Sequence, residues 1–196
     1  GDAFQDMLDK SLRDLKRDRK IADRIVVDEG HQFVGFDAYQ GVIDSCDVIV
    51  HATPPGFRPA HLRACVDAGK HVFTEKPVAV DAPGVRSVIE TCRLAQEKGL
   101  NMVSGLCYRY QFAKRETIKR LQDGAIGDIL TLQTTYNTGG LWHKGREPEW
   151  SEMEYQMRNW IYFDWLSGDH INEQHIHSLD KIAWLMQDVP PVKCTA

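Results

Sequence analysis

Two groups of ionisable residues, far apart in the sequence, have types and spacings that suit proton transfer at a ligand site. The first is Glu75-Lys76-Pro77, which ends the short apolar run of residues 69–77. Proline lacks an N–H and disfavours helical geometry in the residue before it, so we expect Lys76 at a fixed strand end. Open parallel sheets bind ligands outside the carboxyl ends of their strands, which makes these residues candidates for a site. A surface ion pair at a strand–loop junction is the alternative.

The second group lies on a predicted helix near the end of the sequence and comprises His170, Glu173, His177 and Asp180. At about 100° per residue these four side chains fall on one stripe of the helix. An imidazole beside a carboxylate is suited to move a proton near neutral pH. The stripe could instead hold a zinc or iron ion, with His175 turned elsewhere, although the spacing matches neither H-E-x-x-H nor H-x-x-E-H. A polar face at a subunit contact is a third interpretation.

The elements around the first group predict a parallel sheet. The apolar run from Asp47 to Pro54 is typical of a strand buried on both faces, and residues 100–106 form another apolar strand. Two segments with helical spacing, 60–68 and 83–98, are each followed by a glycine that can end a helix. Strands that alternate with helices in this way indicate a βαβ organisation. Upstream we expect a helix over residues 6–24, a short strand over 33–36 and a short helix over 38–43.

The pattern changes after residue 108, where we expect a second domain to begin, so that the domains span residues 1–108 and 109–196. The expected elements are a helix over 113–123, a half-exposed strand over 129–136, a helix over 169–186 and a strand start at 192–194. Between them, residues 137–165 are rich in tryptophan and contain the pair Gly139-Gly140. A long aromatic and polar excursion of this kind is either a binding loop or an interface arm.

Composition excludes several classes of partner. Lys and Arg number 24 against 28 Asp and Glu, a net charge of -4, so nucleic acid is not expected as a partner. The apolar stretches are far shorter than the roughly 20 residues of a membrane span, so no membrane partner is expected. Five widely spaced cysteines favour a reducing compartment, and we expect a cytoplasmic protein. The chain starts at Gly1 and reads as one whose beginning is removed, which leaves an export signal open.

Four motifs occur in a characteristic order. They are Ala52-Thr53-Pro54-Pro55 after a buried strand, Ala68-Gly69-Lys70-His71-Val72 leading into Glu75-Lys76-Pro77, Gly124-Ala125-Ile126-Gly127-Asp128-Ile129, and Glu173-x-x-x-His177-x-x-Asp180. Together they resemble the Gfo/Idh/MocA family of nicotinamide-dependent sugar and polyol oxidoreductases over nearly the whole chain. The resemblance implies an α/β fold: a partial Rossmann domain with a parallel sheet, then the start of an α/β domain with an open antiparallel sheet. That second sheet often serves dimerisation, which implies a homo-oligomer.

The family chemistry is hydride transfer between a carbinol carbon and a nicotinamide, while a base removes the hydroxyl proton. By position, the resemblance assigns catalytic roles to Lys76, His177 and Glu173, the last standing where the family usually has Asp. The implied cofactor-binding residues are Asp2, Ala52, Thr53, Pro54, Pro55, Glu75, Lys76 and Pro77. The implied substrate-binding residues, for a sugar or polyol, are Lys76, Arg109, Trp142, His143, Arg158, Glu173 and His177. A carboxylate at Asp2 would repel a 2′-phosphate, so NAD is expected rather than NADP.

Three features depart from the family pattern. No G-x-G-x-x-G occurs in the 196 residues, so we expect them to bind NAD poorly by themselves. Gly56 and Arg58 stand where many members have histidines, and His175 replaces a small residue. Two other functions share the same residues: an NAD-dependent glycoside hydrolase that works by transient oxidation, and a non-catalytic sugar-binding or assembly protein. In the preferred interpretation the site contains no metal.

Overall fold

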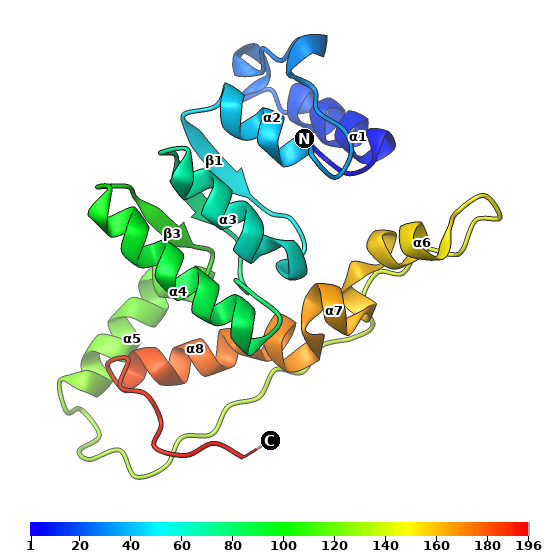
Figure 1. Cartoon of the computed structure of the whole chain (residues 1–196). Coiled ribbons are helices and arrows are strands. Elements are labelled where there is room, and N and C mark those ends of the chain that lie inside the picture. The colour runs from blue at the N-terminus through cyan, green and yellow to red at the C-terminus, as the bar shows by residue number, and fades with distance from the viewer. Residues whose placement is uncertain (196) are drawn as a thin grey trace. The chain divides into compact units, whose positions relative to one another are not determined.

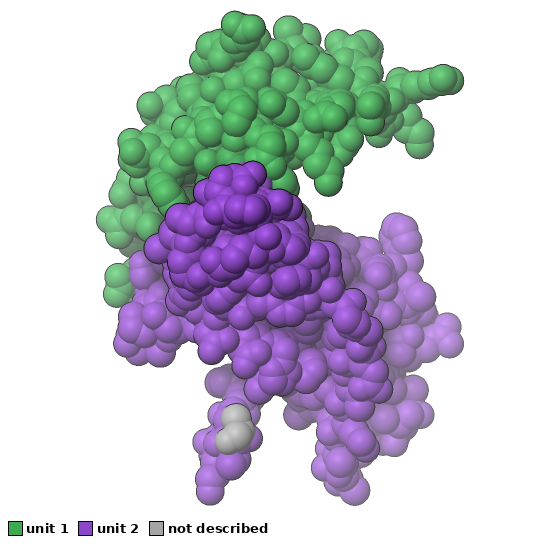
Figure 2. All heavy atoms as spheres, turned by 90° about the vertical axis from the view of Figure 1, so that its right-hand side faces the viewer, with its two compact units in different colours: residues 1–51, 60–74, 88–103 green, residues 52–59, 75–87, 104–196 purple. Residues whose placement is uncertain are grey.

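The computed structural model describes residues 1–195 and divides into two compact units. Unit 1 comprises residues 1–51, 60–74 and 88–103, and unit 2 comprises residues 52–59, 75–87 and 104–196 (Figure 2). The chain therefore passes between the units several times. Both segments that the sequence singled out for chemistry, residues 75–77 and the helix near residue 177, belong to unit 2.

Unit 1 is built on a three-stranded sheet of the Rossmann type, in the order β1-β2-β3. Figure 1 labels the two outer strands, β1 and β3. β1 (Val48–His51) pairs in parallel with β2 (His71–Thr74), with Val48 opposite His71, and β3 is Met102–Ser104. The connecting helices are α3 (Arg58–Asp67) and α4 (Ala82–Glu97). Their buried side chains form the core with the sheet, and include Leu62, Cys65, Val66, Val88 and Ala95. The predicted parallel βαβ organisation is confirmed.

The glycines that follow both helices have the geometry expected of a helix end. Gly69 has a φ of 73° and Gly99 a φ of 68°, in the left-handed region where a side chain would be strained. In each case a main-chain N–H of the next residue bonds back into the helix, from Lys70 to Cys65 and from Leu100 to Ala95. These turns direct the chain into β2 and β3.

The start of unit 1 is less regular than the sequence suggests. α1 spans Gln5–Arg17 and α2 spans Ala38–Ser45, with short 3₁₀ helices at Ala22–Arg24 and Glu29–His31. The helix expected over 6–24 ends early because its apolar stripe stops at Leu15, so the following charged turn has nothing to pack against. The strand expected over 33–36 is reduced to one parallel bridge, between Asp2 and Val34.

Unit 2 is mainly helical, and its helices are short. They are α5 (Phe112–Gln122), α6 (Glu152–Arg158), α7 (Asp164–Ser167) and α8 (Ile176–Leu185). Single 3₁₀ turns occur at Pro55–Phe57, Cys107–Tyr110 and Trp160–Tyr162. α8 packs against α5, and the Gln122 side chain donates to the Trp184 carbonyl at 2.8 Å.

Two expectations for the second half of the chain are wrong in detail. The helix expected over 169–186 is interrupted, because Ile171–His175 is a π-helical turn that precedes α8. Residues 129–136 and 192–194 form no strand, since none of the described residues pairs with them as a neighbouring strand. Over residues 1–195, no helix is long and apolar enough to span a membrane.

Candidate active site

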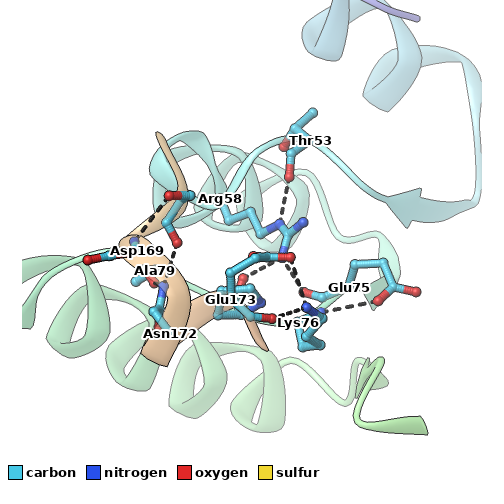
Figure 3. Close-up of polar contacts among 10 residues, drawn as sticks. Thr53, Arg58, Glu75, Lys76, Ala79, Asp169, Asn172 and Glu173 are labelled. Carbon is cyan, nitrogen blue, oxygen red and sulfur yellow. Dashed lines mark hydrogen bonds and ion pairs between the residues drawn. The ribbon is translucent and has the colours of Figure 1, made fainter. Parts of the chain in front are cut away.

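The two groups of ionisable residues meet in unit 2. Lys76 follows the end of β2, and its Nζ donates to Glu173 Oε1 at 2.8 Å and to the Glu173 main-chain carbonyl (Figure 3). The peptide bond from Lys76 to Pro77 is cis. The two side chains are only 13% and 8% exposed, so the ion pair is nearly enclosed. A contact across 97 positions of the sequence therefore joins the strand end to the π-helical turn.

Glu173 retains one carboxylate oxygen without a partner. Its Oε2 is buried and accepts no hydrogen bond, although the neighbouring Oε1 accepts from Lys76. Burial raises the pKa of Glu173, and the positive charges of Lys76 and Arg58 only partly oppose that rise. Buried carboxylate oxygens are normally satisfied, so this one is suited to receive a hydroxyl from a bound ligand.

His177 lies in the first turn of α8, and its ring contacts two tyrosines. The ring centroid is 5.1 Å from Tyr108 in an edge contact and 5.9 Å from Tyr136 in a stacked one. Its Nδ1 is buried and has no hydrogen-bond partner. Burial lowers the pKa of His177, and the positive charge of Lys76 lowers it further. The imidazole is therefore neutral at pH 7 and can accept a proton.

Arg58 is a part of the site that the sequence did not assign. Its side chain is buried, with Nε donating to the Thr53 carbonyl at 2.7 Å and Nη1 to the Glu75 carbonyl at 2.8 Å and to the Pro77 carbonyl. Burial lowers the pKa of Arg58 to about 10, so the guanidinium remains charged at neutral pH. Arg58 thus fixes the turn after β1 to the segment that carries Lys76 (Figure 3).

No pattern in the sequence points to this role, although the position of Arg58 is unusual for a cation. Arg58 is the first residue of α3, and the N-terminus of a helix disfavours a cation. A buried cation at that position requires other acceptors, and the three carbonyls supply them.

Two glycines allow the main chain to pack closely around the site. A Cβ on Gly56 would overlap the main-chain oxygen of Trp165, which explains why no larger residue stands there. A Cβ on Gly105 would lie 2.5 Å from Glu75 Oε2, so that glycine leaves room for the Glu75 carboxylate. Glu75 Oε2 also accepts from the Lys76 main-chain N–H at 3.3 Å.

The residues expected to bind the cofactor divide between the two units. All but one of them lie in unit 2, namely Ala52, Thr53, Pro54, Pro55, Glu75, Lys76 and Pro77. Within that set, Pro55 begins the 3₁₀ turn after β1 and is buried. Asp2 lies in unit 1, where its Oδ1 accepts from the Phe4 N–H at 2.9 Å in front of α1.

The remaining residues expected to bind substrate make contacts elsewhere in unit 2. Arg109 forms ion pairs with Asp180 at 2.8 Å and Asp188 at 2.6 Å, and these two carboxylates raise its pKa. Trp142 packs near Trp160, His143 Nε2 lies 3.0 Å from the Tyr155 hydroxyl, and Arg158 pairs with Glu154 at 2.9 Å. The structure thus joins Lys76 directly to Glu173, and the charge of Lys76 also acts on His177. The other four expected residues engage partners elsewhere in unit 2.

The polar stripe of the last helix does not act as one cluster. Glu173 pairs with Lys76, Asp180 pairs with Arg109, and His170 Nδ1 lies 3.0 Å from Asp169 Oδ1. The π-helical turn breaks the regular spacing that would have aligned these side chains. In the part of the chain from residue 1 to 195, no three His, Cys, Asp or Glu side chains are grouped to hold a metal ion. The geometry does not support the metal interpretation of the stripe.

The chain is similar to known oxidoreductases. The model of an oxidoreductase family with an NAD-binding Rossmann fold matches residues 12–105. A scyllo-inositol 2-dehydrogenase (NADP(+)) of Bacillus subtilis is 32% identical over 132 residues, which cover 67% of this chain and 34% of that protein. An inositol 2-dehydrogenase of Serratia proteamaculans is 27% identical over 192 residues, covering 96% of this chain and 46% of that protein.

The fold has relatives among solved structures. The aldose-aldose oxidoreductase of Caulobacter crescentus, crystallised with glycerol, superposes with a TM-score of 0.66 at 21% identity, over 95% of this chain and 48% of that one. At that identity the likeness shows the fold alone. The chain spans about a third to a half of the length of the relatives it matches.

Proposed function

Because the chain belongs to the Gfo/Idh/MocA family of oxidoreductases, we propose that the protein transfers a hydride between NAD or NADP and a sugar, an inositol or a related polyol. One observation carries the proposal: the enclosed Lys76–Glu173 pair beside a neutral His177, where two buried acceptor atoms have no partner. Oxidation of an alcohol needs a group that holds the hydroxyl and a group that takes its proton, and this cluster contains both.

Each residue has a defined task in this proposal. Lys76 Nζ donates to the oxygen of the reacting hydroxyl and so favours the developing alkoxide. His177 Nδ1 accepts the hydroxyl proton, because it is the imidazole atom left without a partner. Glu173 Oε2 accepts from a second hydroxyl of the substrate and thereby orients the ring. The nicotinamide, when bound, supplies the hydride acceptor.

The residues present fit one end of such a cofactor. The Thr53-Pro54-Pro55 turn and residues 75–77 come from the carboxyl ends of neighbouring parallel strands, where α/β sheets receive nucleotides. Arg58 holds the two segments at a fixed separation. These segments would contact the nicotinamide end. The 196 residues contain no glycine-rich fingerprint for the pyrophosphate.

Further parts of the proposal concern the whole protein. We retain the domain boundary at residue 108, with residues 109–196 contributing to a substrate and dimerisation domain. That domain would carry an open antiparallel sheet. Two copies of the protein would then associate through that sheet.

The test uses the protein as it is encoded in full, with NAD or NADP and a panel of inositols and aldoses, and follows absorbance of the reduced cofactor. We expect turnover with at least one polyol, and a fall of about 10²–10⁴-fold in kcat for Lys76→Met and for His177→Asn. Lys119→Met and His31→Asn, at exposed positions outside the cluster, are the matched controls. The proposal fails if no polyol is oxidised by the wild-type protein, or if both site variants keep its rate.

A further inference from the structure

A hollow of about 220 Å³ lies beside Glu173 in unit 2. Its lining includes Leu141, Tyr162, Asp164, Asp169, His170 and Glu173. The volume is below the ~300–1,000 Å³ of pockets for drug-sized molecules, so it suits one small ring or part of one. Because Glu173 belongs both to this lining and to the ion pair with Lys76, a group in the hollow would adjoin the proposed reaction centre.

The lining carries negative charge. Asp164 and Asp169 are exposed carboxylates, and hydrogen bonds from the His170 main-chain N–H and ring lower the pKa of Asp169. Among the described residues that line the hollow, none is Lys or Arg. The one basic side chain, His170, is engaged with Asp169 at 3.0 Å. Tyr162 adds an aromatic wall, with its hydroxyl donating to the Leu141 carbonyl.

The backbone beside the hollow has an uncommon conformation. Asp169 has a φ of 65°, directly after Gly168 with a φ of 73°, and the π-helical turn Ile171–His175 follows (Figure 3). A non-glycine residue in the left-handed region and a π turn both occur preferentially at functional sites. The turn holds Glu173, which is 6% exposed, with its Oε2 unpartnered. A buried acceptor without a donor therefore belongs to the same lining as the two exposed carboxylates.

We propose that this hollow holds the part of the substrate that is not oxidised, and that it selects amino polyols over acidic ones. The inference rests on the proposed function and adds the charge class of the substrate. An ammonium group can donate to Asp164 or Asp169 and lie against the face of Tyr162. A carboxylate or phosphate at the same place meets these two like charges, and no Lys or Arg belongs to the described lining.

The test compares three sugars that share a ring and differ in charge: D-glucosamine, D-glucose and D-glucuronate. Dissociation constants are measured by ligand-observed NMR on the protein as encoded in full. We expect glucosamine to bind roughly tenfold more tightly than glucuronate at low salt, with the difference reduced at high salt. In the double variant Asp164→Asn/Asp169→Asn the two sugars should bind within a small factor of each other. Asn tolerates the left-handed conformation of residue 169, so this variant is expected to fold.

Asp128→Asn, an exposed carboxylate outside the lining, is the control and should leave the ranking unchanged. The inference is overturned if glucuronate binds as tightly as glucosamine, if none of the three sugars binds, or if the double variant keeps the wild-type ranking. Turnover of neutral polyols is assayed in parallel, so that failure of the charge preference can be told apart from failure of the proposed function. A protein that oxidises neutral polyols and shows no charge preference contradicts the inference alone.

Discussion

The ion pair between Lys76 and Glu173 is better suited to chemistry than to stability. Removing two charges from water costs several kcal/mol, and a buried pair often recovers no more than that cost. Here burial raises the pKa of Glu173 even though Lys76 is 2.8 Å away, so desolvation outweighs the attraction of the partner. Such a pair can exchange part of its contact for a substrate hydroxyl at little net cost. The charge of Lys76 also acts on His177, the proposed proton acceptor, so a hydroxyl held by the pair would lie near the group that takes its proton.

The lowered pKa of His177 predicts the acid limb of the pH–rate profile. A protonated imidazole cannot accept a proton, so kcat/KM should fall as the pH drops through the pKa of His177. Because burial and Lys76 hold that pKa below its ordinary value of about 6.5, we expect activity to persist at pH values just below 6.5 and to fall at more acid pH. The measurement is kcat/KM against pH.

A substitution at Lys181 tests whether His177 sets the acid limb, and it leaves the proposed catalytic groups in place. The charge of Lys181 also lowers the pKa of His177, and its Nζ lies 5.0 Å from the centre of the Tyr108 ring. Lys181→Met should therefore move the acid limb to slightly higher pH while the plateau rate stays near that of the wild type. An acid limb above pH 7 in the wild-type protein, or no shift in the variant, would contradict this account of His177.

At the scale of elements, two side chains and one glycine hold the segments around the site. Arg58 joins the turn after β1 to residues 75–77, and Gly56 lets that same turn meet the start of α7 without a clash. Asn172 in the π-helical turn donates to the Ala79 and Ser167 carbonyls, both at 2.9 Å. The position of Glu173 relative to Lys76 therefore depends on the contacts of Arg58 with residues 75–77 and on those of Asn172 in the π-helical turn.

Arg58→Met should destabilise the protein by roughly 2–4 kcal/mol, because three partly buried carbonyls lose their donor. Arg58→Lys should recover little of that loss, since a single ammonium cannot reproduce the planar fork of the guanidinium. Chemical denaturation followed by circular dichroism measures both changes. A midpoint unchanged in Arg58→Met would show that the three hydrogen bonds do not hold the turn.

Gly56→Ala should also be destabilising, by about 1–3 kcal/mol, because its Cβ would meet a main-chain oxygen that cannot move independently. The matched control is Gly139→Ala, where a Cβ would have no heavy atom within 4 Å and the glycine is not at positive φ. Thermal unfolding of the two variants compares the same chemical change at a tight and an open position. Equal shifts in Tm would remove the packing argument for Gly56.

At the scale of the whole molecule, a histidine outside the proposed site should make stability depend on pH. His61 in unit 1 is stacked on Tyr39 at 4.0 Å, and burial lowers its pKa to about 4. The unfolded chain binds that proton near pH 6.5, so folding is penalised as the pH falls from about 6.5 towards 4. The contribution of His61 is thus fully present above pH 6.5.

Allowing for partial exposure, we expect a loss of about 1–2 kcal/mol in the free energy of unfolding across that range. His61→Phe keeps the ring contact with Tyr39 and removes the titration, so its stability should be less dependent on pH. The measurement is the free energy of unfolding at pH 4.5 and at pH 7, from denaturation curves. An equal loss of stability between these pH values in wild type and His61→Phe would contradict the role of His61.

The sequence predicts the βαβ part of the fold because each of its elements has a local signal. Apolar runs define β1 and β2, and Gly69 and Gly99 end the helices where the structure has positive φ angles. The meeting of Lys76 with Glu173 follows from no local pattern, and only the ordered motifs of a family implied it.

Other features depend on contacts that spacing does not reveal. A regular period of about 3.6 residues per turn places His170 on the stripe of Glu173 and His177, but a π turn breaks that period. The role of Arg58 depends on three main-chain carbonyls, two of them after β2, which have no signature in the sequence. The strand expected over 129–136 has the composition of a strand but needs a neighbour to pair with.

The most direct test of the account is to follow deuterium from a polyol that carries it on the carbinol carbon. In the protein as encoded in full, we expect the deuterium to appear in the released reduced cofactor, in equal amount to the ketone or lactone formed. The same experiment with Lys76→Met should show transfer slowed by about 10²-fold or more. A cofactor that stays oxidised while the product retains the deuterium would contradict net oxidation at the Lys76–Glu173–His177 cluster.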